Sequence, residues 1–108
     1  MRIIDKTLPL ISVEDFSVKY NLSLEMCERP GFAASKLHRY HCHFVGQVTG
    51  NLTETKDRGR LVGTYGNGDT QEEAIADYAR ELIGKVLVVD SQTPDRREIQ
   101  CPNEWKTP

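Results

Sequence analysis

The side chains best suited to chemistry are concentrated in residues 38–43, with the sequence His-Arg-Tyr-His-Cys-His. On a β-strand, His41 and His43 point to the same side, about 7 Å apart, so a zinc ion could lie between their imidazole rings. A third ligand must come from elsewhere, and the candidates are Cys27, His38 and Cys101. We take Cys27, His41 and His43 as the predicted zinc set. The alternative is that both histidines furnish a solvated or partner-binding sheet face, with no cofactor.

The sequence offers no convincing nucleophile or phosphate loop. Cys42 lies between His41 and His43, but neighbours on a strand point to opposite faces and cannot easily activate its thiol. The three cysteines are odd in number and lack Cys-x-x-Cys spacing, which indicates free thiols in a reducing cytosol. Residues 66–68 (Gly-Asn-Gly) are predicted to form a turn before a helix; they lack a Walker lysine, and acidic residues follow them. We therefore expect a protein that is not an enzyme.

Charge is segregated along the chain. Acidic side chains gather on one predicted helix and the turn before it: Asp69, Glu72, Glu73, Asp77 and Glu81. Basic side chains gather in predicted loops and at strand ends: Lys36, Arg39, Lys56, Arg58, Arg60, Arg96 and Arg97. An acidic helix can bind the basic groove of a nucleic-acid-handling protein and compete with its substrate. The alternative is a helix with ordinary solvating charge.

The first half of the chain predicts one short helix followed by strands. Ser12 can cap a helix over 13–20, with Ile11 and Phe16 as its hydrophobic staple. Apolar and polar residues then alternate over 22–26 and again over 40–44, which is the period of half-buried strands. Residues 46–59 are predicted to be a long exposed connection, and residues 61–65 a third strand. The three strands should form an antiparallel meander.

The second half begins with the clearest element, a helix over 70–83. Thr70 and Glu73 form a capping box, and the Glu73 carboxylate is expected to reach the Thr70 amide. The helix shows an apolar stripe of Ile75, Tyr78, Ala79 and Leu82, and Gly84 ends it. Residues 85–89 and 97–101 are predicted strands. Val86–Val89 could pair across a twofold axis in a homodimer if its edge is uncovered.

These elements predict an α+β fold. It is a two-layer sandwich in which one main helix packs across an antiparallel three- to five-stranded sheet, with a short N-terminal helix. With 108 residues the chain has room for a single domain, residues 1–102, followed by a tail, residues 103–108. The net charge of −2 provides no global positive field for nucleic acid. No signal peptide or membrane span is visible, so we expect a cytoplasmic protein.

The run Gly66–Ile75 (GNGDTQEEAI) resembles the start of the main helix in HicB-like proteins. In that family a Gly-x-Thr-x-Glu-Glu-Ala segment follows a three-stranded meander and opens the helix laid across it. The resemblance covers about a third of the chain. This chain departs from the family in its extra N-terminal helix, in its longer loops and in lacking a Pro-Gly-Cys segment in the third strand. It implies the fold and a habit of binding protein partners, but not an antitoxin role, because no DNA-binding segment is appended.

The strand-strand-strand-helix order is also similar to double-stranded-RNA-binding domains, but those carry lysines where this chain has Asp69, Glu72 and Glu73. The chain is similar in style to short proteins of phages and mobile elements. We therefore expect a non-enzymatic module that binds a host protein, as a phage-encoded, anti-CRISPR-like inhibitor of a nucleic-acid-handling protein. The expected partner-binding residues are Asp69, Glu72, Glu73, Asp77, Glu81, Arg39, His41 and His43. The alternatives are a nucleic-acid-binding domain, using Arg39 and both histidines, and a zinc-binding structural protein.

Overall fold

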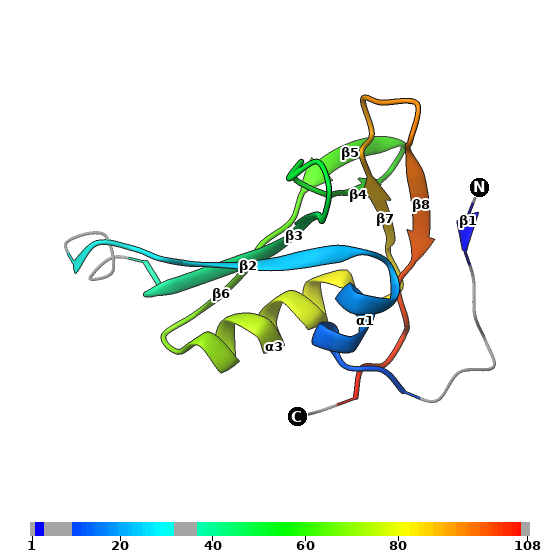
Figure 1. Cartoon of the computed structure of the whole chain (residues 1–108). Helices are drawn as coiled ribbons and strands as arrows, with labels where there is room; N and C mark the ends of the chain where they lie inside the picture. Colours follow the sequence, from blue (N-terminus) through cyan, green and yellow to red (C-terminus); the bar gives the residue numbers. More distant parts are fainter. Residues whose placement is uncertain (1, 4–9, 32–36, 107–108) are drawn as a thin grey trace.

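The computed structural model describes residues 2–3, 10–31 and 37–106, which form two sheets and two helices (Figure 1). The three-stranded sheet has the order β2 (Leu22–Glu28), β3 (Tyr40–Gly46), β6 (Gly66–Gly68). The five-stranded sheet has the order β1 (Arg2–Ile3), β8 (Arg97–Gln100), β7 (Val86–Val89), β4 (Glu54–Asp57), β5 (Arg60–Gly63). The helices are α1 (Val13–Lys19) and α3 (Gln71–Leu82). The predicted α+β sandwich with one main helix is confirmed.

The short helix α1 begins where the sequence predicts, at Val13, and ends one residue earlier than predicted, at Lys19. The Ser12 hydroxyl accepts a hydrogen bond from the Asp15 amide at 3.1 Å, which satisfies one of the free donors of the first turn. Asn21 follows the helix with a φ of 57°, the left-handed conformation that asparagine tolerates. Val13 and Phe16 are buried, so the helix adds to the core rather than lying loosely on the surface.

The main helix α3 lies directly on β6. The Thr70 hydroxyl accepts from the Glu73 amide, as predicted, but the Glu73 carboxylate accepts from the Asp69 amide and not from that of Thr70. A Cβ atom on Gly66 would come within 2.2 Å of the Ala74 carbonyl oxygen, so only glycine lets the two backbones approach this closely. The predicted turn at residues 66–68 is therefore a strand pressed against a helix.

The predicted meander is correct for its first two strands and wrong for the third. β2 and β3 pair antiparallel, with Leu24 opposite Phe44. The third strand of that sheet is β6, whereas residues 60–63 form β5 and pair with β4 in the other sheet. Glycine strands carry no apolar alternation, so the pattern gave no sign of β6.

The predicted long connection over 46–59 contains the strand β4. The sequence shows no alternation of apolar residues here, because the buried side chains just before and within the strand, Thr53 and Thr55, are polar. Hydrogen bonds satisfy both. The Thr53 hydroxyl donates to the Phe44 carbonyl oxygen at 3.0 Å, and the Thr55 hydroxyl lies 2.8 Å from that of Thr64. Threonine suits a strand, and its bonded hydroxyl can be buried at little cost.

Strand β7 lies in the middle of the five-stranded sheet, between β8 and β4. Leu87, Val88 and Val89 are fully buried. The predicted twofold pairing through Val86–Val89 is therefore wrong, because both edges of this strand already have partners. Within the described part of the chain, no helix is long and apolar enough to span a membrane.

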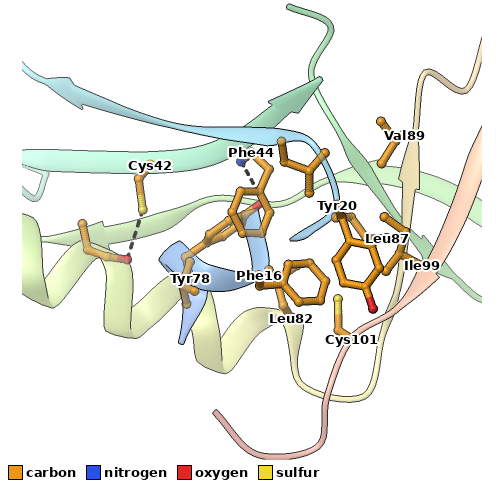
Figure 2. Close-up of a cluster of buried hydrophobic side chains, with 13 residues drawn as sticks. Phe16, Tyr20, Cys42, Phe44, Tyr78, Leu82, Leu87, Val89, Ile99 and Cys101 are labelled. Carbon is orange, nitrogen blue, oxygen red and sulfur yellow. Dashed lines mark hydrogen bonds between the residues drawn. The ribbon is translucent and has the colours of Figure 1, made fainter. Parts of the chain in front are cut away.

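The core joins both helices to both sheets (Figure 2). The Phe44 ring packs on Phe16 and on Tyr78, with centroids 5.8 and 5.1 Å apart. The Tyr78 hydroxyl accepts a hydrogen bond from the Phe44 amide at 2.9 Å. Within the predicted tail, Trp105 contacts Phe16 edge-on and its Nε1 donates to the Ala79 carbonyl oxygen at 2.8 Å. Residues 107–108 lie outside the described residues.

Candidate functional site

The three-stranded sheet has two faces of different chemistry. Its inner face meets the helices, because the Cys42 thiol donates to the Ala74 carbonyl oxygen of α3 at 3.3 Å. His41 and His43 alternate with Cys42 and therefore point to the opposite, outer side. The predicted partner-binding residues are thus divided between two surfaces. The acidic helix patch comprises Asp69, Glu72, Glu73, Asp77 and Glu81, and the outer sheet face comprises Glu25, Cys27, His41, His43 and Tyr65.

The outer sheet face is built from aligned imidazoles under a tyrosine. The His41 and His43 rings are 6.4 Å apart between centroids and nearly parallel. The Tyr65 ring meets both edge-on, at 6.2 and 5.2 Å. Cys27 lies opposite His41 across the sheet, and Glu25 lies opposite His43. Tyr65 was not predicted to belong here; it lies in the link between β5 and β6, which the sequence assigned to the end of a strand over 61–65.

Burial favours the neutral form of both histidines. The Nδ1 atoms of His41 and His43 are buried without a hydrogen-bond partner among the described residues. Burial lowers the pKa of both side chains below the ordinary 6.5; the Arg29 charge and the neighbouring His43 lower that of His41 further, while Glu25 opposes the shift at His43. Because an unpaired buried N–H is costly, we assign the single proton of each ring to Nε2. The two imidazoles therefore carry little charge near neutral pH, and the nearby Arg29 guanidinium supplies a positive charge beside His41.

The predicted zinc ligands share a face but do not converge on one point. Cys27, His41 and His43 all lie on the outer sheet face, as predicted. However, the residues that the structure describes contain no group of three or more His, Cys, Asp or Glu arranged to hold a metal ion. Of the other candidate third ligands, Cys101 is buried in the core and the His38 Nδ1 lies 3.2 Å from an Asp69 carboxylate oxygen. Zinc binding remains a prediction from the sequence.

The two core cysteines are poorly suited to nucleophilic chemistry. Burial raises the pKa of Cys42 to about 11 and that of Cys101 to about 12. Thiolates are the reactive form, so both groups are largely inert at neutral pH. Cys42 also points away from the two histidines that flank it in the sequence. Cys27 is half-buried, on the other face of the sheet.

Most carboxylates of the acidic helix patch have a local partner. Asp77 lies deepest, since it accepts from the Asn67 amide at 2.8 Å and from Arg80 at 3.2 Å, and so ties α3 to β6. Glu81 lies 4.0 Å from Lys85. Glu72 and Glu81 are about two and a half turns apart and so lie on opposite flanks of the helix. The patch therefore surrounds the outer side of α3 and is not a single stripe.

The local ion pairs do not neutralise the acidic helix patch. The side chain of Asp69 is 73% exposed and that of Glu81 is 50% exposed, so their pairs with His38 and Lys85 sit in water. Exposed pairs contribute about 0–1 kcal/mol and exchange readily. The carboxylates of Asp69, Glu72 and Glu81 are consequently available to cations of another molecule.

Several of the predicted basic residues are already paired. Arg39 precedes β3 and donates two hydrogen bonds to one Glu28 oxygen, at 2.9 and 2.7 Å. Lys56 and Arg96 both contact Glu98, and the hydrogen bond from Lys56 lowers the pKa of that carboxyl. Lys36 lies outside the described residues. A hollow beside the start of α3 mixes both signs of charge, since Glu73, Asp77 and Arg80 all line it.

Comparison of this chain with protein-family models, curated proteins and solved structures gives no significant match. The relationship to HicB-like proteins remains a prediction. Two surfaces are candidates for function. One is an exposed acidic patch around a rigidly seated helix, and the other is a sheet face of imidazole and phenol rings.

Proposed function

We propose that this protein is a non-enzymatic binding module whose acidic helix patch docks onto the basic groove of a nucleic-acid-handling protein. The observation that carries the proposal is the arrangement around α3. The apolar side of the helix is sealed by Ala74, Tyr78 and Leu82, while Asp69, Glu72 and Glu81 remain exposed. A rigid helix that carries surface carboxylates loses little conformational entropy when it meets a complementary surface.

The charge of this patch determines the kind of partner. Like-charged surfaces repel one another, and a patch of carboxylates attracts clustered Arg and Lys. Such clusters line the grooves of proteins that hold phosphate backbones. By occupying that groove the chain would exclude nucleic acid. We therefore propose an inhibitor of a host nucleic-acid-handling protein, encoded by a phage and anti-CRISPR-like in its action, which works in the cytoplasm.

The test is affinity capture from nuclease-treated host lysate with the immobilised chain, followed by competition. We expect to retain a stoichiometric protein whose nucleic-acid binding is weakened when the purified chain is added. The variant Glu72→Gln/Glu81→Gln should lose this partner, because it removes two exposed carboxylates of the acidic helix patch.

The matched control is Asp57→Asn/Asp95→Asn, which changes the net charge equally but on exposed residues outside the patch. It should retain the partner fully. Equal capture by both variants, or a partner whose nucleic-acid binding the chain leaves unchanged, would contradict the proposal.

A further inference from the structure

The longest open sheet edge of the described chain belongs to β2. This seven-residue strand pairs only with β3, because the order of its sheet is β2-β3-β6. The other end strands are shorter, with two residues in β1, three in β6 and four in β5. A long strand with one unpaired side presents a row of N–H and C=O groups to any chain that can pair with it.

The hydrogen bonds at the two ends of β2 show which of its groups face outward. The Asn21 carbonyl oxygen accepts from Gln47, and the Arg29 amide donates to the Arg39 carbonyl oxygen. In an antiparallel ladder the residues that bond to a neighbour alternate. The odd-numbered residues of β2 therefore bond to β3, and the outward groups belong to the even-numbered ones: Leu22, Leu24, Met26 and Glu28.

The open edge lacks the usual protection against pairing. Natural edge strands are commonly blocked by proline, by lysine or by a bulge. Strand β2 (LSLEMCE) contains no proline or lysine, its two charges are Glu25 and the terminal Glu28, and its register with β3 is continuous from Leu22 to Glu28. Its side chains alternate between the apolar inner residues and Ser23, Glu25 and Cys27 on the outer side. A strand added at this edge would therefore continue both the apolar inner face and the polar outer face of the sheet.

We propose that β2 pairs antiparallel with β2 of a second copy of this chain, across a twofold axis at Leu24. Outward residues must pair with outward residues, so an axis at Leu24 sets Leu24 opposite its own copy and Leu22 opposite Met26 of the second copy. These are apolar pairs on the inner side. On the outer side Glu25 faces Ser23 of the second copy, to which its carboxylate can accept a hydrogen bond.

Other positions of the twofold axis along β2 give less favourable side-chain pairs. An axis at Glu25 sets two carboxylates directly opposite one another, which is destabilising. An axis at Met26 sets Leu24 opposite Glu28, whose carboxylate already binds Arg39. An axis at Ser23 leaves only residues 22–24 paired with strand residues of the second copy, whereas an axis at Leu24 pairs residues 22–26. Leu24 is therefore the centre at which the strand is most complementary to itself. The dimer would hold one continuous six-stranded sheet, with an acidic helix patch on each copy.

The test is light scattering on the eluting protein over a range of concentrations, with two variants at one position. Ser23→Glu sets like charges opposite each other twice across the axis, so we expect the dimer to dissociate, with its dissociation constant raised roughly tenfold or more. Ser23→Lys sets opposite charges together at the same two places and should preserve or tighten the dimer. Circular dichroism on both variants checks that the monomer remains folded.

Disulfide trapping tests the register separately. Leu24→Cys should cross-link under oxidation because the two substituted residues face each other, whereas the parent chain sets Cys27 opposite Asn21 and should not. A parent chain that is monomeric at every concentration would overturn the proposal. So would a dimer that responds equally to both Ser23 variants, or a monomer that binds an extended basic peptide at this edge instead.

Discussion

Consecutive residues of β3 meet opposite environments on the two faces of the three-stranded sheet. On the inner face Cys42 and Phe44 are fully buried, and the amide of Phe44 is bonded to Tyr78. On the outer face His41 and His43 meet the ring of Tyr65, and each leaves a ring nitrogen without a partner among the described residues. Alternation along a strand therefore assigns each side chain to a face, while the element that covers that face decides the chemistry of the side chain.

The contact between α3 and β6 should be the most sensitive part of the inner face. A Cβ atom in Gly66→Ala would lie 2.2 Å from the Ala74 oxygen and 2.4 Å from the Tyr78 Cβ. Because backbone atoms cannot move aside cheaply, we expect the free energy of unfolding to fall by about 3 kcal/mol or more. Urea denaturation measures this. Gly31→Ala is the control, with nothing within 4 Å, and a similar loss in both variants would contradict the packing argument.

The reaction rates of the cysteine thiols should also differ between the two faces. Burial raises the pKa of Cys42 from 9.0 to about 11, so its thiolate fraction at pH 8 falls about a hundredfold. We expect Cys27, on the outer sheet face, to react with a disulfide reagent at least that much faster than Cys42 or Cys101. The reagent should label one thiol rapidly in the native chain and all three in denaturant. Rapid native labelling of Cys42 would refute the assignment of the faces.

Two tyrosines give a matched pair of smaller changes. Tyr78→Phe removes the acceptor for the buried Phe44 amide, and we expect a loss of about 2 kcal/mol in unfolding free energy. Tyr65→Phe, on the outer sheet face, removes a hydroxyl from a side chain that is 42% exposed and should cost less than about 0.5 kcal/mol. Chemical denaturation of both variants checks the difference. Equal losses in the two variants would contradict the claim that the Tyr78 hydroxyl is buried and bonded while the Tyr65 hydroxyl is open to solvent.

Acid should act mainly on the outer sheet face. The folded chain lowers the pKa of His41 and His43 below 6.5, so between that value and the folded pKa values the unfolded chain binds more protons. Stability should therefore decline as the pH falls from about 7 toward 5, and level off below the folded pKa values. Melting temperatures across this range provide the measurement. His41→Gln/His43→Gln, which keeps the exposed His38, should show a smaller decline; an unchanged decline would assign it to other groups.

The smallest expected effect is that of Glu25 on the pKa of His43. Its carboxylate lies 3.9 Å from the His43 Nε2 and raises the pKa of that histidine against the effect of burial. In Glu25→Gln we expect the His43 titration, followed by NMR, to move to a lower pH. A shift to a higher pH would mean that the carboxylate does not act on this ring.

The sequence by itself determined the local structure. Capping at Ser12 and Thr70 sets the starts of both helices, because these bonds form between residues three positions apart. The alternation over 22–26 and 40–44 sets β2, β3 and their faces. With the apolar stripe of α3, these local patterns were enough to predict the α+β class and to place His41 and His43 together.

Only the tertiary structure decided which strands share a sheet. β6 is a strand because its glycines let α3 approach, and Thr53 and Thr55, just before and within β4, are buried because their hydroxyls find carbonyl and hydroxyl partners. Tyr65 reaches the histidines only because β6 then pairs with β3. β7 becomes central and β2 becomes an edge for the same reason. Strand pairing joins residues far apart in the chain, and no local periodicity records which strand lies next to which.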